Sequence, residues 1–485
     1  MSAHERVPNE LWLEIFGLIP QDSLKHIHAT DRKFANVSRA LLFSHLVFHP
    51  YHLDQVERRL TLPSPDGVQL ALDRLNFWSS DDISPYVREC TIAPRCWRAG
   101  EAGSVLLEHT DSPHILMISF MDLLAKFTAL KKLSARQAHF TQAGLVSLCQ
   151  LPLLTELATR WCDIVPGETI DATSLQLRTT KLLHHADVGV AWDEDKLCTL
   201  WLSIVHRECL QELQLTGSGS GFEGPAFPNV SRLGLGPNFS TMNRNLATLS
   251  RFPAVRKLWL QGLGEFQYQS TDASSLHGHD VLPLLQEYSG SWKPLHMFLP
   301  KPTLACLDIH FCTPEELSSQ LREEYRHITS LYATLIDLDQ QTLNTICTCL
   351  PELTELHIRI YTFDDAQRED GFNPKATSFF STFGTTLTSL PPTLKRLAIA
   401  WEFEFESDDA QVVYPGPKHI PDFLAMRDKL RKRCPALRTL WLDGHHFIFR
   451  WRQLLDREEM EQQNEIKATE IENLRERFKD FWEGR

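Results

Sequence analysis

Long apolar runs are missing from this sequence. No stretch reaches the roughly 18 apolar residues that a membrane-spanning helix needs. The first residues, MSAHERVPNELW, also lack the basic start and apolar stretch of a signal peptide. Hydrophobic residues nevertheless make up 42% of the 485 positions, enough for a packed core and too many for a disordered chain. We therefore expect a soluble protein of the cytoplasm or nucleus that does not bind a membrane.

Paired cysteines and an excess of basic charge are missing as well. The eleven cysteines are scattered, and none forms a Cys-x-x-Cys pair, so neither a disulfide framework nor a zinc site is indicated. The net charge of −13 argues against a duplex-binding protein. The basic run from Lys429 to Arg433 is interpreted as a solvated helix face.

Catalytic and cofactor motifs are also lacking. There is no Gly-x-Ser-x-Gly elbow, P-loop, kinase motif or His-Glu-x-x-His pattern among the 21 histidines. Gly219 to Gly224 matches G-x-G-x-x-G, but Pro225 follows where a helix should begin, so a loop between repeats is favoured. We expect a non-catalytic protein with no cofactor and no metal.

The first fifty residues predict a small helical unit. Pro8 suits a helix start, Leu11, Ile15 and Ile19 follow at a spacing of four, and a further helix is expected from about Arg32 to Leu42. A unit of about 40 residues buries too little surface to be stable alone. Its apolar surface must meet either a partner or the remaining chain, as a cap on the repeats.

This segment resembles an F-box. The family's opening pattern is matched by Val7 to Leu11 and by Ile15-Phe16, and Leu24 matches the leucine that opens the second helix. Thr30-Asp31 stands where many members have Val-Cys. The resemblance implies docking to the Skp-type adaptor of a Skp–cullin–F-box ubiquitin ligase. The residues that it implies hold the adaptor, or shape the surface that does, are Pro8, Leu11, Ile15, Phe16 and Leu24.

The rest of the chain repeats the phrase L-x-x-L-x-L, often after a proline. Central leucines recur at intervals of 24 or 25 residues, as from 133 to 157 and from 331 to 356. This period and phrase resemble leucine-rich repeats. Leucines two positions apart share one face of a strand. We expect parallel strands, side by side in one curved sheet, at Leu133, Leu157, Leu213, Leu233, Leu258, Leu307, Leu331, Leu356, Leu397 and Leu440, with a degenerate repeat near Leu282.

The predicted fold is therefore an α/β repeat, with a three-helix F-box followed by an irregular leucine-rich-repeat solenoid. The boundaries are 1–48 for the F-box, 49–84 for linker helices, 85–450 for the solenoid and 451–485 for a C-terminal amphipathic helix. Insert loops are expected near 265–300, 361–390 and 401–420. The pairing of F-box and loose repeats resembles large fungal F-box families.

The residue between the last two anchors of each phrase points outward and can touch a partner. Trp259, Asp308, His357 and Trp441 occupy such positions and suggest a mixed aromatic and polar strip for a protein substrate. The alternative is that insert loops or the C-terminal helix cover these tryptophans. That helix carries an apolar stripe of Ile471, Leu474, Phe478 and Phe481 beside Trp482, and it either caps the last repeat or docks a partner.

One further segment, from Glu402 to Glu406, alternates acidic and aromatic residues. It is either a solvated strand or an acidic strip for a basic substrate. The function predicted from the whole sequence is substrate recognition in a ubiquitin ligase, with the cullin recruited through the adaptor. The alternatives are a complex with the adaptor that lacks a cullin and a leucine-rich-repeat scaffold whose N-terminus is only a cap.

Overall fold

The computed structural model describes residues 8–54, 59–61, 63–95, 115–164, 175–183, 194–216, 226–236, 249–260, 281–361, 378–380, 382–383, 389–402, 422–444, 447–454, 457–463, 478 and 482. These residues fall into two compact units. The first contains the described residues up to 254, and the second contains those from 255 onward.

Three short helices open the first unit: α1 (Asn9–Gly17), α2 (Gln21–His28) and α3 (Arg32–Leu42). Phe16, Leu24, Val37 and Leu42 form their shared core. The expected third helix has the predicted bounds, and Asp31 explains its start, because its carboxylate accepts a 2.7 Å hydrogen bond from the amide of Lys33. The N-terminus therefore has its own small core.

A ladder of parallel strands follows in the first unit. In spatial order it contains β1 (His45–Phe48), β4 (Glu89–Ile92), β5 (Lys132–Arg136), β7 (Glu156–Arg160), β9 (Thr179–Leu183), β10 (Glu212–Leu215) and β11 (Arg232–Leu235). One buried residue of each strand lies beside the next, so that the row reads Leu46, Cys90, Leu133, Leu157, Thr180, Leu213 and Leu233.

Helices and short strand pairs complete the first unit. The helices are α4 (Pro65–Trp78), α5 (Ile115–Leu123), α6 (Gln142–Cys149) and α7 (Glu194–Ser203), with 3-10 turns at Ser84–Tyr86 and Leu124–Lys126. The pairs are β2 (His52–Asp54) with β3 (Arg59–Thr61) and β6 (His139–Phe140) with β8 (Asp163–Ile164). The span 49–84, expected to be linker helices, therefore contains strands as well as α4, and the ladder begins at β1, before residue 85.

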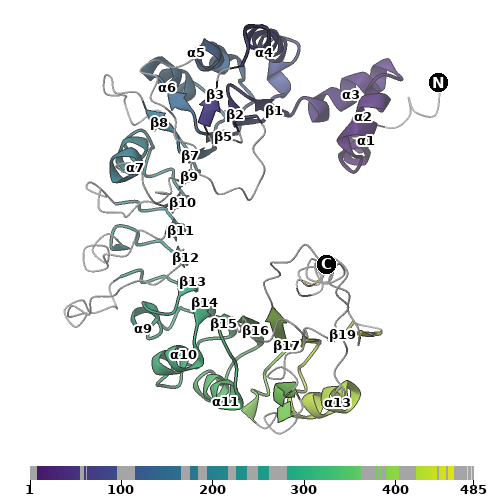
Figure 1. Cartoon of the computed structure of the whole chain (residues 1–485), viewed down its shortest axis with the longest axis vertical. Coiled ribbons are helices and arrows are strands. Elements are labelled where there is room, and N and C mark those ends of the chain that lie inside the picture. The colour runs from purple at the N-terminus through teal and green to yellow at the C-terminus, as the bar shows by residue number, and fades with distance from the viewer. Residues whose placement is uncertain are drawn as a thin grey trace. The chain divides into compact units, whose positions relative to one another are not determined.

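The second unit has a ladder of the same kind. Its parallel strands are β12 (Lys257–Leu260), β13 (Glu287–Ser291), β14 (Cys306–Cys312), β15 (Ser330–Leu335), β16 (Glu355–Tyr361), β17 (Arg396–Glu402) and β18 (Thr439–Asp443). The helices α9 (Leu295–Phe298), α10 (Pro314–Gln320) and α11 (Gln340–Cys349) follow one another along one side of the strands (Figure 1). Its buried row reads Leu258, Tyr288, Leu307, Leu331, Leu356, Leu397 and Leu440.

All ten predicted leucines therefore lie in parallel strands, and this part of the prediction is confirmed. Each unit has a leucine-rich-repeat-like architecture, in which one face of a strand is buried only against the equivalent faces of its neighbours.

The degenerate repeat is centred on Tyr288 rather than on Leu282. Tyr288 occupies the buried position beside Leu258, and its hydroxyl donates a 2.5 Å hydrogen bond to the carbonyl of Ser291. Gly290 takes the next inward position with φ of +146°, and a Cβ there would lie 2.4 Å from the carbonyl oxygen of Leu260. The leucine phrase is lost here because the backbones approach too closely for a second side chain.

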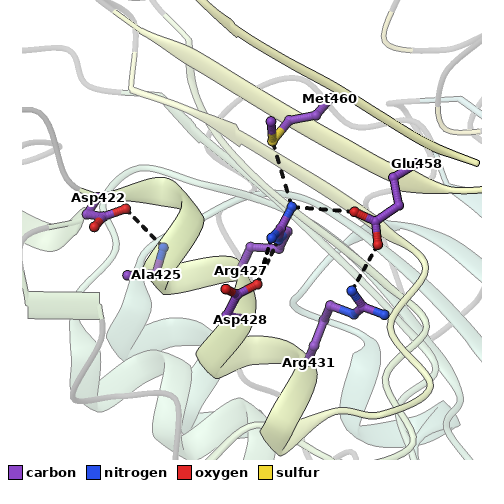
Figure 2. Close-up of polar contacts among 7 residues, drawn as sticks. All are labelled: Asp422, Ala425, Arg427, Asp428, Arg431, Glu458 and Met460. Carbon is purple, nitrogen blue, oxygen red and sulfur yellow. Dashed lines mark hydrogen bonds and ion pairs between the residues drawn. The ribbon is translucent and has the colours of Figure 1, made fainter.

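The second unit ends in two antiparallel strands, β19 (Ile448–Gln453) and β20 (Glu458–Gln463), where the sequence suggested the start of a helix. Figure 2 shows how α13 (Phe423–Arg433) meets β20. Arg431 lies 2.9 Å and Arg427 3.5 Å from the carboxylate of Glu458. The strands and helix α13 thus close the described end of the ladder.

The buried row predicts that replacing a buried leucine lowers the free energy of unfolding much more than replacing an exposed one. We expect Leu356→Ala to lower the free energy of unfolding by about 2–5 kcal/mol, because it leaves a cavity among fully buried neighbours. Urea unfolding followed by circular dichroism measures this. Leu424→Ala, at an exposed position of α13 in the same unit, is the control and should cost less than about 1 kcal/mol. Equal losses in the two variants would contradict the assignment of the row.

Candidate functional site

The second unit carries a second row of residues on the face opposite to the buried anchors. We call it the outward row: Trp259, Ser289, Asp308, Tyr332, His357, Ala398 and Trp441, each paired in register with the next. Alternation along each strand places these side chains together, because residues on either side of a buried anchor point to the other face. The sequence pattern placed Trp259, Asp308, His357 and Trp441 in this row, and it missed Ser289 and Tyr332.

Next to Trp259 at one end of the outward row, Ser289 and Asp308 form a ring of three polar side chains with His310, two residues further along β14. The hydroxyl of Ser289 donates a 2.8 Å hydrogen bond to Oδ2 of Asp308, and Nε2 of His310 lies 3.2 Å from that hydroxyl and 3.3 Å from the same carboxylate oxygen. Burial acts to raise the pKa of Asp308, but hydrogen bonds and charge from His310, together with Ser289, outweigh it and lower the pKa. Asp308 therefore stays ionised at neutral pH.

The ring does not have the geometry of a nucleophilic triad. In such a triad the hydroxyl and the carboxylate use opposite nitrogens of the histidine. Here Ser289 and Asp308 both face Nε2 of His310. The arrangement offers a half-exposed carboxylate, a hydroxyl and an imidazole edge, which suits recognition of a polar group.

The other end of the outward row is aromatic and covered. Phe478 and Trp482, which we call the C-terminal aromatic pair, both have helical backbone and lie over this end. Phe478 makes edge contact with Trp441 at 5.0 Å between ring centroids and lies 4.7 Å from the ring of His357. Ala398, Trp441, Ile448 and Trp482 are buried together, with Tyr332 and Phe478 packed against them.

Hydrogen bonds fix the orientation of this aromatic contact. The hydroxyl of Tyr332 donates a 2.7 Å hydrogen bond to Oε2 of Glu355, and Nε1 of Trp482 donates a 3.4 Å hydrogen bond to the Tyr332 oxygen. Arg396 lies 3.5 Å from Glu355 and 5.9 Å from the Trp482 ring centre. Burial raises the pKa of Tyr332, the hydrogen bond from Trp482 opposes this rise and the Glu355 carboxylate adds to it, so the phenol remains protonated.

The four predicted substrate-contacting residues therefore lie in different environments. Trp259, in β12, is half-buried, and Asp308 belongs to the polar ring. His357 and Trp441 lie under the C-terminal aromatic pair, and Trp441 is only 2% exposed. The chain's own C-terminal aromatic pair covers Trp441, as the alternative interpretation expected. The apolar stripe in residues 471–482 was the sequence signal for this cover, although nothing in the sequence located where it docks.

A second candidate surface lies on α1. Leu11 and Ile15 are 48% and 45% exposed, and Leu18, just beyond the helix, is 88% exposed. Their spacing places them along one side, with Leu13 also exposed. Pro8 is exposed at the helix start, whereas Phe16 and Leu24 are buried beneath it. The five residues implied by the resemblance thus divide into exposed contacts and internal supports.

Other sequence features have structural explanations where they are described. His45 hydrogen-bonds to Thr91 and His49 to the carbonyl of Ala93, and no group of three metal-binding side chains occurs within the described ranges. In the basic run, Arg431 contacts Glu458 and Arg433 donates to the carbonyl of Leu390. No helix in the described part of the chain is long and apolar enough to cross a membrane. Residues 219–224 and 403–406 lie outside the described residues.

The chain matches no protein-family model and no curated protein sequence. Among solved structures it is similar to a chain of a TLR13–ssRNA13 complex, with 15% identity and a TM-score of 0.34. That match covers 73% of this chain and 39% of the other chain, so this chain corresponds to well under half of the neighbour's length. The repeat architecture described above rests on the strands and registers of this chain.

The aromatic cover predicts a pH dependence of stability. Burial, and then the positive charge of Arg359, lower the pKa of His357 from 6.5 to about 3, against an opposing effect of Asp308. The Glu355–Arg396 pair and the Tyr332 phenol also face this region. As the pH falls below 6.5, His357 becomes protonated in the unfolded chain but stays neutral in the folded protein. The free energy of unfolding therefore decreases progressively between pH 6.5 and 3.

We expect His357 to account for up to about 2 kcal/mol of lost unfolding free energy between pH 7 and pH 5. Urea unfolding at both pH values, for wild type and His357→Gln, measures it as the difference between the two pH effects. An identical pH effect in both proteins would show that His357 stays accessible to protons in the folded state.

Proposed function

We propose that the chain is the substrate-recognition subunit of a Skp–cullin–F-box ubiquitin ligase, with α1 to α3 docking the Skp-type adaptor and the repeats binding a protein substrate. The observation that carries the proposal is the apolar side of α1, formed by Leu11, Ile15 and Leu18, which stands exposed on helices that already have a core. Exposed contiguous apolar surface of this kind is typical of an interaction site.

The alternative of a cap packed against the repeats is less well supported. A cap would bury its apolar side against the first strands, but Leu11 and Ile15 are about half exposed in the full chain. The contact between the helices and the repeats instead uses Phe43, whose ring lies 5.5 Å from that of Trp78 on α4. The apolar side of α1 is thus left available, because Phe43 makes the contact with α4.

The repeats support the second half of the proposal. Their strands bury one face and present the outward row, whose described side chains form a polar ring and an aromatic site rather than a nucleophile with its base. A receptor of this kind acts by proximity, since holding a substrate near the charged ubiquitin carrier raises the effective concentration without chemistry of its own.

The adaptor contact is tested with Leu11→Ala/Ile15→Ala in the full chain. We expect this double variant to lose at least about thirtyfold in affinity for a purified Skp-type adaptor, because truncating a central interface anchor often costs about 2 kcal/mol or more. Titration by surface plasmon resonance measures the loss. The thermal transition should be unchanged, because both side chains are exposed.

Leu70→Ala, at a 71% exposed position of α4, is the matched control and should bind the adaptor like wild type. Full binding by Leu11→Ala/Ile15→Ala would refute adaptor docking through α1. Addition of a cullin to the assembled complex then separates two outcomes: co-elution of all three proteins supports the ligase, and exclusion of the cullin supports an adaptor complex that lacks it.

A further inference from the structure

We propose that Tyr332, His357, Ala398 and Trp441 form a receptor site for a helical peptide with two aromatic residues four positions apart, and that the C-terminal aromatic pair occupies this site as an intramolecular ligand. A protein partner with the same pattern would exchange with the chain's own C-terminal segment. This inference rests on the second half of the proposed function, that the repeats bind a protein, and is independent of the adaptor.

The fit of the C-terminal aromatic pair identifies the shape of the ligand. Phe478 and Trp482 are four positions apart, each with helical backbone, and their rings stack at 24° with centroids 5.6 Å apart. Ala398 supplies the floor between larger neighbours, because its short side chain leaves room for the rings and is itself fully buried. The site is therefore shaped for two adjacent rings.

The polar edge of the site selects between the two aromatic positions. Because the Tyr332 hydroxyl donates to Glu355, its oxygen is oriented to accept from an indole N–H, which is what Trp482 provides. Phe478 makes ring contacts with Trp441, His357 and Trp482, and it packs against the apolar cluster that contains Ala398 and Ile448. The second aromatic residue of a ligand must therefore be tryptophan, whereas the first needs only a ring.

The intramolecular arrangement makes exchange feasible. A tethered ligand acts at an effective concentration on the order of 1 mM, so even modest intrinsic affinity keeps the site filled. A partner replaces it by supplying further contacts, and the outward row offers them next to the site. Asp308 lies beside Tyr332 in register, and its ionised carboxylate with Ser289 and His310 suits a basic or hydrogen-bond-donating side chain of that partner.

The test uses a fluorescently labelled synthetic peptide of residues 466–485 and the full-length protein. We expect Phe478→Ala/Trp482→Ala protein, whose site is vacated, to bind the peptide at least tenfold more tightly than wild type in fluorescence anisotropy. Adding Trp441→Ala to the vacated protein should weaken binding at least tenfold. A peptide with Trp482→Phe should bind more weakly than one with Phe478→Tyr, since only Trp482 donates to Tyr332.

Several results would overturn the proposal. Equal peptide binding by wild type and the vacated protein would show that the C-terminal pair does not compete for the site. No binding to a vacated protein with wild-type circular dichroism would show that the site is not a receptor. If the double variant unfolds, Trp482→Phe in the full chain replaces it, with binding at least threefold tighter than wild type expected and no change counting against the proposal. Adaptor affinity should be the same in all variants, so failure here leaves the adaptor contact separately testable.

Discussion

The lateral register of the parallel strands is the constraint on which the rest of the structure depends. Backbone hydrogen bonds place Leu331 beside Leu307 on one strand and Leu356 on the next, so the inward side chains stack into one continuous row. A shift of one residue in any strand would turn its buried leucine outward and its outward residue into the core. The same register therefore stabilises the units and determines the order of residues along the outward row.

Where a strand lacks the leucine phrase, the register survives because other contacts replace it. Thr180 holds the buried position between Leu157 and Leu213. Its hydroxyl is buried without a hydrogen-bond partner among the described residues. Tyr288 fills the equivalent position in the second unit, and its hydroxyl donates to the carbonyl of Ser291. The backbone pairing thus tolerates residues that the leucine pattern excludes, whether or not their polar groups find a partner.

Because strands without the leucine phrase also join the ladder, the sequence predicts only those strands that carry the phrase. The leucine anchors were predictable because they recur at a period of 24 or 25 residues and at a spacing of two within each strand. The strand at Thr179–Leu183 was not, because its TTKLL sequence has no leucine in the anchor position. The strands β19 and β20 were missed for a different reason: the segment after Trp451 is rich in Glu, Gln and Arg, which favour helices, and the antiparallel pairing of β19 with β18 and of β20 with β19 overrides that preference.

In the candidate sites, local sequence patterns predicted where side chains point but not which distant segments contact each other. Alternation within a strand was enough to place Trp259, Asp308, His357 and Trp441 outward, and helical spacing was enough to place Phe478 beside Trp482. Neither pattern specifies that the two sets meet, because the contact between His357 and Phe478 joins residues more than a hundred positions apart.

The two candidate surfaces differ in how the chain treats exposed apolar groups. On α1 it leaves large aliphatic side chains open, which favours a surface available at all times. On the outward row it covers indole and imidazole rings with a segment of its own, and that cover keeps these rings out of water. Burying two aromatic side chains is worth a few kcal/mol, enough to hold a tethered segment in place and small enough for a partner's contacts to exceed. The aliphatic surface therefore suits constant association, and the aromatic surface suits association that depends on competition.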